Sequence, residues 1–519
     1  MTQPKRTLLF ISCAPFALAA CGGADDVASP GEGNLVIVAP APAPTPPPPP
    51  PPPAATGPAA RCPAGTADVG TTANRRVCQI QGRLAGNTVL RNFRGLVYQL
   101  SGVVQVGTDV GPDGNTAGGA PATLTIEPGT VVVGSSGADA LVINRGSQIF
   151  AEGTTARPIV FTSRANLEGN STDNSIGQWG GVVILGRAPN SACIGSGQTP
   201  GGPDCQGAVE GVSNAFYGGN APADNSGRIA NLQVRFSGFE VTPGNELNGI
   251  TLAGVGNGTT MNNIQVHNSS DDGIEWFGGR VNHRYLALTG IDDDSVDTDN
   301  GYRGDMQFVV AAQRANGGDA IIEAGTGNDA APPRSFPRIA NFTFVSRRNT
   351  NATLFRGGTD FALINGVIAG PAGSFCVDVD GNATIQASNA NDAGPPRFES
   401  VFLSCGTAFR NDPGAAGSAD TVTADQIAAA FNAGSNNLSS GTSTLTNTFV
   451  NGANETARPV FNAGSVSAFF TATTYIGAVR DANDTSFRGW TCDSATADFG
   501  SGRQCSAAPA DTGTVEVTA

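Results

Sequence analysis

The middle of the chain consists of short runs in which apolar and polar residues alternate, separated by Gly, Asn and Asp. Residues 124–132 align with residues 141–149, and a polar-small-apolar segment recurs later at a spacing of about 22 residues. The recurring segments are Asn248-Gly249-Ile250, Asp272-Gly273-Ile274, Asp294-Ser295-Val296 and Asp319-Ala320-Ile321. Alternation predicts β-strands, and a repeat of this length predicts three short strands per turn of a coil. The pattern therefore predicts an all-β fold, a parallel β-helix (solenoid) whose inward apolar residues stack in columns.

The repeat is clear in residues 121–410 and weakens on both sides. An open coil needs its ends covered, so we expect an N-terminal cap over residues 61–120 and a mixed, partly helical C-terminal cap over residues 411–519. One helix is predicted after Thr423, because Thr423 and Gln426 match a capping box that precedes an apolar run. The repeat is too short for a propeller, whose blades span about 40 residues.

The N-terminus has the pattern of an export segment. A short basic stretch precedes the apolar residues 8–20, which are too few to span a bilayer. Leu18-Ala19-Ala20-Cys21 matches the lipobox of bacterial lipoproteins, so we expect a signal peptide over residues 1–20 and lipidation of Cys21; an ordinary secretory signal with a chance Cys is the alternative. Residues 21–60 are Pro-rich, and such a segment forms a stiff tether. The expected location is the outer membrane, on its periplasmic side or at the cell surface.

The charge and the few basic residues of the chain exclude several classes of function. Acidic residues exceed basic ones, 43 against 29, and the net charge is −14, which excludes nucleic acid as the natural partner. Lys5 is the sole lysine, so the mature protein has no lysine for catalysis. The only histidines are His267 and His283, too few for a His-rich zinc site.

Eight cysteines remain when Cys13 and Cys21 are set aside. An even number in an exported protein suggests disulfides, and the eight fall into four close sequential pairs. The expected pairs are Cys62–Cys78, Cys193–Cys205, Cys376–Cys405 and Cys492–Cys505. No pair has CxxC spacing, so redox catalysis is not expected.

Several motifs along the coil suggest a family. They include Gly129-Thr130 after an apolar strand, residues 158–162, Trp179-Gly-Gly and the residues that follow it, the acidic segments 270–275 and 292–299, and Tyr475-Ile-Gly. With these motifs the chain resembles the pectin-lyase-like right-handed parallel β-helix superfamily. Within that superfamily it resembles a group of secreted bacterial lipoproteins. The resemblance covers roughly residues 86–495 and implies the fold and export rather than an activity.

Two acidic groups lie one repeat apart. The repeat places Asp272 beside Asp294 and Glu275 beside Asp297. If Ile274 and Val296 point inward, Glu275 and Asp297 point outward on one face. Stacked carboxylates repel unless a cation lies among them or one is protonated. The candidate Ca²⁺ ligands are Asp272, Glu275, Asp293, Asp294, Asp297 and Asp299. Two alternatives remain open: these residues satisfy turns, or they form a catalytic site.

The resemblance implies two enzyme classes, calcium-dependent polysaccharide lyases and inverting glycoside hydrolases. A hydrolase would use Asp271, Asp272, Asp294 and Asp297 as candidate catalytic residues. A lyase would need Arg280, Arg284 or Arg303 as its base. The chain lacks the Gly-His-Gly and Arg-Ile-Lys elements of polygalacturonases. We expect His267 and His283 to be structural, and Trp276 to point into the core.

We therefore expect a lipid-anchored cell-envelope protein with a binding or structural role, and glycans with calcium on the acidic face are the favoured ligands. The first alternative is a carbohydrate-active enzyme that uses the same face. The second is an accessory lipoprotein of an outer-membrane transporter. The expected partners are the membrane, through the lipid on Cys21, and a polysaccharide or an outer-membrane protein.

Overall fold

The computed structural model describes residues 57–517, except for 328–330, 387–390 and 415–418. The expected signal peptide, Cys21 and most of the Pro-rich tether lie outside the described residues. Within the described ranges, no helix is long and apolar enough to cross a membrane.

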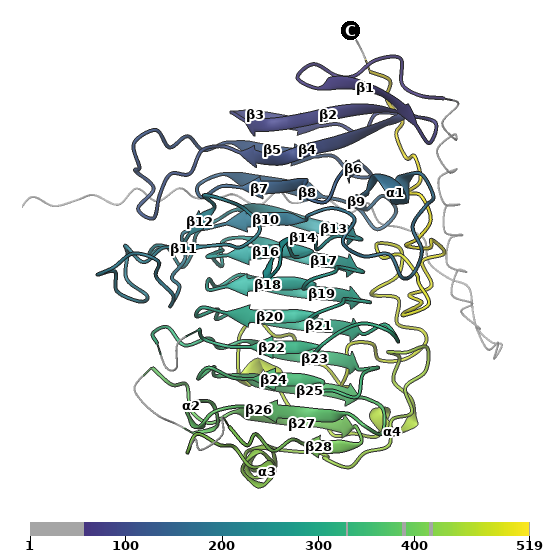
Figure 1. The fold of residues 1–519 in the computed structure, drawn as a ribbon. Helices are drawn as coiled ribbons and strands as arrows, with labels where there is room; N and C mark the ends of the chain where they lie inside the picture. The colour runs from purple at the N-terminus through teal and green to yellow at the C-terminus, as the bar shows by residue number, and fades with distance from the viewer. Residues whose placement is uncertain (1–56, 328–330, 387–390, 415–418, 518–519) are drawn as a thin grey trace, which may run out of the picture. The chain divides into compact units, whose positions relative to one another are not determined.

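The described chain winds into a coil with three faces, each a stack of parallel strands (Figure 1). Face A consists of β7 (Ala140–Ile143), β10 (Val182–Leu185), β16 (Ile250–Ala253), β18 (Ile274–Phe277), β20 (Val296–Asp299), β22 (Ile322–Ala324), β24 (Thr353–Phe355), β26 (Phe375–Val379) and β28 (Thr407–Phe409). The predicted all-β parallel β-helix is confirmed.

Faces B and C share long strands that bend midway. These are β13 (Gly227–Arg235), β17 (Thr260–His267), β19 (Asn282–Thr289), β21 (Asp305–Ala312), β23 (Arg338–Val345), β25 (Ala362–Ala369) and β27 (Arg397–Ser404). Nearer the N-terminus, face B contains β3 (Asn87–Leu90), β5 (Thr123–Ile126) and β8 (Gln148–Glu152). Face C there contains β2 (Arg75–Leu84), β4 (Leu96–Val106), β6 (Val131–Gly134) and β9 (Ile159–Ser163). The later halves of β2 and β4 continue onto face A.

The bend in the long strands is a column of left-handed residues. Asn231, Asn263, Tyr285, Phe308, Asn341, Asn365 and Ser400 all have φ between 49° and 63°. Asn tolerates this conformation better than other non-glycine residues, which explains why it occupies four of these seven stacked corners. Tyr285 and Phe308 interrupt the Asn column, and their rings stack 4.7 Å apart.

The interior is filled by residues at alternate positions of each strand, as the repeat predicts. Ile250, Ile274, Val296 and Ile322 stack in register and are fully buried. Trp276 points into this core and is 0 % exposed, as expected from alternation. Its indole Nε1 donates to His283 Nε2 at 3.0 Å, so the indole N–H has a partner inside the core, whereas Nδ1 of the same imidazole is buried without one.

The N-terminal end of the coil differs from expectation. Residues 61–120 are not a separate cap, because β2 and β4 already pair in parallel as the first turn of the coil. The covering element is β1 (Ala67–Thr72), which pairs antiparallel with β2 and so stops the parallel stack.

The predicted C-terminal cap region consists of a helix over the last turn and a long segment that returns along the coil. The predicted helix is α3 (Ala424–Ala433), with the capping box of Thr423 and Gln426 in place, and it packs Ile427 and Phe431 against the last turn. From residue 435 the chain turns back and follows faces B and C to the first turn, where Val515 forms a β-bridge with Phe93 (Figure 1). We call residues 435–517 the strap.

Amide side chains of the coil hold the strap. Gln265 exchanges two hydrogen bonds with the backbone of Cys492 (3.0 and 2.7 Å), Gln307 does the same with Thr471 (2.7 and 2.9 Å), and Asn365 with Phe461 (2.8 and 2.9 Å). Each amide thus acts as a neighbouring strand would, because it offers one donor and one acceptor to an extended backbone.

The remaining elements are short. They are the helices α1 (Arg164–Leu167), α2 (Asn382–Ile385) and α4 (Ala453–Thr456), the 3₁₀ turn η1 (Ala463–Ser465), and the antiparallel pairs β11 (Gly207–Ala208) with β12 (Phe216–Tyr217) and β14 (Glu240–Thr242) with β15 (Asn245–Glu246). All four predicted disulfides are present, Cys62–Cys78, Cys193–Cys205, Cys376–Cys405 and Cys492–Cys505.

Candidate metal centre

The outward positions of face A change character along the coil. One outward column, in register from turn to turn, contains Val142, Val183, Thr251, Glu275, Asp297, Glu323, Leu354 and Asp378. Strand alternation explains the direction of these side chains, since Ile274 and Trp276 fill the core and leave Glu275 on the outer side. The column is therefore apolar at the N-terminal end and acidic on β18, β20 and β22, and Leu354 of β24 interrupts it before Asp378.

An insertion between β10 and β13, residues 186–226, covers the apolar part of face A. Its Val209, Val212 and Tyr217 pack with Val183 and Leu185 of β10. The β14–β15 hairpin leads directly to Leu247, which belongs to the same apolar cluster, and to Asn248. Glu275 lies at the edge of this cover, which explains why an outward-facing carboxylate is only 5 % exposed.

Three carboxylates meet at this edge. One oxygen from each of Asp272, Glu275 and Asp297 lies within 4.8 Å of the other two. Asn248 Nδ2 donates to Glu275 Oε2 at 2.6 Å, and the backbone N–H of Asp294 donates to Asp272 Oδ1 at 3.1 Å. We call Asp272, Glu275 and Asp297 the inner triad. The two hydrogen bonds hold its carboxylates in place, but both donors are neutral and do not compensate the negative charge.

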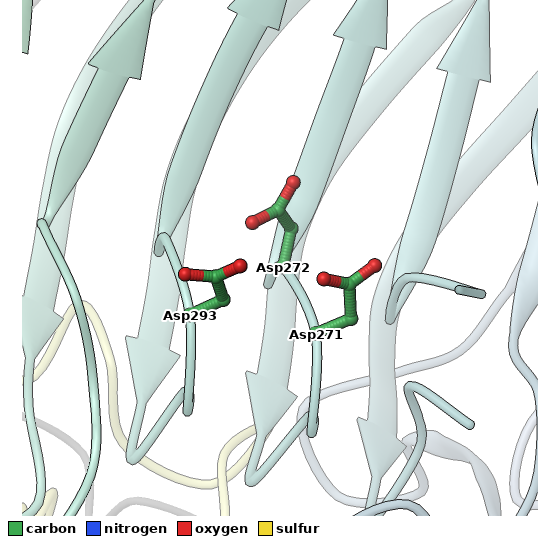
Figure 2. Close-up of side chains that lie close together, drawn as sticks. All are labelled: Asp271, Asp272 and Asp293. Atoms are coloured by element: carbon green, nitrogen blue, oxygen red, sulfur yellow. The ribbon is translucent and has the colours of Figure 1, made fainter. Parts of the chain in front are cut away.

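A second triad shares one member with the first. Carboxylate oxygens of Asp271, Asp272 and Asp293 also lie within 4.8 Å of one another. Figure 2 shows Asp271 and Asp272 on one turn of the coil and Asp293 on the next. Asp272 is the most buried of these three and belongs to both triads.

Burial and mutual repulsion dominate the electrostatics of both triads. Loss of hydration raises the pKa of Asp272, Glu275 and Asp297 well above the usual range, and the neighbouring carboxylates raise it further. The pKa of Asp271 is raised to about 8 by the same two causes. Among the described residues, no ion pair with an Arg or His involves the inner triad; the nearby guanidinium groups of Arg314 and Arg356 pair with Asp292 and Glu323.

The structure therefore divides the six predicted metal ligands. Asp272, Glu275, Asp293 and Asp297 belong to the two triads, whereas Asp294 and Asp299 do not. Asp294 Oδ1 accepts from the backbone N–H of Ala320 at 2.7 Å, which is the turn chemistry that the alternative interpretation expected.

Asp299 lines a cavity of about 340 Å³ next to the inner triad. Asp297 belongs to both the triad and the cavity, and Glu323 and Arg356 form the rest of its charged lining. Arg356 is the only cation among these lining residues and was not a candidate from the sequence, because it lies at a turn without a distinctive motif. Glu210, from the insertion, was also missed; burial first, and then Glu246, raises its pKa to about 7.

The arginines considered as a lyase base lie elsewhere. Arg284 is on β19 and contacts the strap through Thr471 and the ring of Phe469. Arg303 lies over the ring of Phe336. Neither these two nor Arg280 lines the cavity beside the triad.

Both histidines are completely buried and act in packing. His283 accepts from Trp276, and His267 Nδ1 lies 2.9 Å from Thr289 Oγ1. Burial lowers the pKa of each histidine to about 3, so both are neutral at physiological pH.

A family model described as a pectate-lyase like beta helix domain matches residues 112–454. No curated protein and no solved structure matches the chain. The matched range contains the strands of face A from β7 to β28 and the acidic turns before β18 and β20. It covers more than half of the chain, so the protein belongs to the pectate-lyase-like beta helix domain family.

Proposed function

We propose that the protein is an exported, lipid-anchored component of the cell envelope that binds a carbohydrate on face A, with calcium held by the inner triad. The observation that carries this proposal is the triad itself: three carboxylates within 4.8 Å, two of them almost fully buried, with no cationic side chain paired to them. In its ionised form such a group is costly unless a cation compensates its charge.

The donor set fits a hard cation. Ca²⁺ takes six to eight oxygen ligands, and three carboxylates on two adjacent turns supply up to six oxygens. Asn248 Oδ1 is buried and has no hydrogen-bond partner, although the same amide contacts Glu275 through its nitrogen. Zn²⁺ fits poorly, because no His or Cys joins either triad. When bound, the cation would supply a fixed positive charge at the edge of the cavity.

The cavity beside the triad supports the carbohydrate part of the proposal. Asp299 and Glu323 accept hydrogen bonds and Arg356 donates them, which suits the hydroxyl groups of a sugar. Asp299 Oδ1 is buried without a partner in the described structure, so it is free to accept one. The neighbouring carboxylates favour a neutral glycan over a polyanion.

The expected anchor completes the proposal. The four disulfides are typical of an oxidising compartment, as an exported protein requires. Lipid on Cys21 would hold the protein at the outer membrane, and residues 21–60 would separate the coil from the bilayer. Labelling with a lipid precursor tests this part, and a Cys21→Ala variant should lose the label.

Catalysis is the second candidate, and one observation favours it. Asp297, Asp299 and Glu323 line one cavity, and burial raises the pKa of all three. A carboxyl that stays protonated near neutral pH is suited to act as a general acid, while a neighbouring carboxylate acts as base.

One experiment separates these functions. Purified protein is incubated with neutral and acidic polysaccharides in calcium and then in chelator, while retention, new reducing ends and unsaturated products are followed. We expect calcium-dependent retention without turnover, lost in Asp297→Asn and kept in Glu152→Gln, which removes an exposed carboxylate on β8. Turnover that disappears in Asp297→Asn would establish the enzyme instead. No retention and no turnover would contradict both functions.

A further inference from the structure

A second cavity, of about 320 Å³, lies between face C and the end of the strap. The coil contributes Val131 of β6, Val160 of β9 and Arg235 of β13, and the strap contributes Arg503 and residues 507–510. The only charged lining residues are therefore two arginines, although the whole chain has a net charge of −14.

Arg235 is a buried cation without a carboxylate partner. Its side chain is 3 % exposed, and its hydrogen bonds go to neutral oxygens: Gln233 Oε1 at 2.9 Å and the carbonyls of Cys505 and Ala507 at 3.1 and 3.5 Å. None of the ion pairs in the described structure includes it. In the sequence of the strap, the acidic residue next to the lining residues is Asp511. Its carboxylate accepts hydrogen bonds from the backbone N–H groups of Gly95 and Gly513, and its charge opposes the lowering of the Arg75 pKa by burial.

Removing a guanidinium from water without a counter-ion is unfavourable, and a second arginine nearby increases the cost. Burial, and then the charge of Arg503, lowers the pKa of Arg235 to about 9, so the group is still cationic at neutral pH. The arrangement lacks a negative charge, and the adjoining cavity has room for one.

We propose that this cavity binds a small oxyanion, either an inorganic tetrahedral anion or the carboxylate of a small organic acid, between Arg235 of the coil and Arg503 of the strap. Guanidinium groups bind oxyanions through paired, charge-assisted hydrogen bonds. Because one arginine belongs to the coil and the other to the strap, the bound anion would also tie the end of the strap to face C. This site is independent of the acidic triads on face A.

The test uses the full chain, titrated with phosphate, sulfate or acetate at constant ionic strength, with chloride as the reference salt. Binding is followed by calorimetry and by hydrogen exchange of the strap. We expect saturable binding of at least one oxyanion, together with slower exchange in residues 502–512. Binding of phosphate and sulfate alone would identify the inorganic source, and binding of acetate alone would identify the carboxylate source.

Two variants and a matched control connect the binding to the cavity. Arg503→Gln removes a half-buried guanidinium that donates to Ala156 O over a long 3.5 Å, while the backbone hydrogen bond from Asp493 stays, so this variant should fold and bind about tenfold or more weakly. Arg235→Gln should abolish binding. Arg228→Gln, on the same strand but paired with Glu152 outside the cavity, should bind as the unchanged protein does. No saturable response to any oxyanion, or equal affinity in Arg503→Gln, would overturn the proposal.

Discussion

At the residue scale, the environment of Glu275 shows how burial changes a carboxylate that the strand pattern places outside the core. Its neighbours along β18, Ile274 and Trp276, face inward, so Glu275 faces outward. The cover above face A nevertheless leaves it 5 % exposed, and burial with Asp297 raises its pKa well above the usual range. A side chain outside the coil can therefore experience the electrostatics of an interior.

The acidic triads predict that stability without calcium falls as pH rises. The pKa of Asp271 is raised from 3.8 to about 8, so the folded state binds its proton more tightly than the unfolded state does. That contribution is complete below the unfolded pKa and is lost as pH rises through the folded pKa, by up to about 1.4 kcal/mol per pH unit. In chelator, the melting temperature should fall between about pH 6.5 and 8.5.

Calcium should flatten this dependence, because the cation compensates the ionised carboxylates. Asp271→Asn should flatten it as well, since the variant has one carboxyl fewer to titrate. A melting temperature in chelator that is constant or rises over the same range would contradict the prediction.

The histidines predict a separate effect on the acid side. The pKa of His283 is about 3 in the fold against an ordinary value of 6.5, so its protonation favours the unfolded state. The stability it contributes is complete above pH 6.5 and is lost as pH falls toward 3. Nuclear magnetic resonance should show no titration of either imidazole above about pH 5. A midpoint between pH 5 and 7 would mean that the ring is accessible.

At the element scale, the strap is held by side chains rather than by a strand ladder. Gln265, Gln307 and Asn365 each satisfy one N–H and one C=O of an otherwise irregular segment. A buried backbone group that loses its partner costs more than an average hydrogen bond contributes. We therefore expect each of these three amides to contribute more to the free energy of unfolding than an average hydrogen-bonding side chain does.

Gln307→Ala tests this directly. The variant removes the amide partner of the N–H and C=O of Thr471, and because Thr471 itself is exposed we expect a loss of about 1–2 kcal/mol in the free energy of unfolding. Denaturant unfolding measures it, with Gln79→Ala as the control, because the amide of Gln79 bonds only to Gln81. Equal stability of the two variants would show that water replaces the lost contacts.

At the scale of the whole molecule, the two long outer coverings lie on different faces of the coil. The insertion covers the first half of face A, and the strap follows faces B and C from the last turn to the first. Each carries its own disulfide, Cys193–Cys205 in the insertion and Cys492–Cys505 in the strap. Damage to one covering should therefore leave the other in place.

Replacing both Cys492 and Cys505 by Ser tests this independence. The bond closes a short loop, so its loss should cost about 3 kcal/mol and expose the strap to proteases first. Calcium affinity on face A should not change. The matched variant, with Cys193 and Cys205 replaced, should have the opposite profile: weaker calcium binding and an intact strap. Loss of both properties in either variant would show that the coverings are coupled.

Much of this fold could be predicted because the repeat is local. Alternation placed Ile274 and Trp276 inside and Glu275 outside, and the repeat length placed Glu275 beside Asp297, where the structure pairs them. Proximity along the chain was enough to pair the cysteines, and a capping box was enough to locate α3. The acidic site was predictable only in outline: Arg356 and Glu210 carry no motif, and Asp294 belongs to a turn rather than to a triad.

Patterns along the chain were enough to predict the all-β coil, its inward and outward positions, the four disulfides and the alignment of carboxylates on adjacent turns. All of these follow from short-range periodicity, in which each residue's role depends on neighbours one strand or one turn away. The folded chain was needed to see that Glu275 is buried, that residues 435–517 return along the coil, and that Arg235 faces a cavity without a counter-ion. Those features depend on contacts between segments far apart in the chain, and no repeat records which segments will meet.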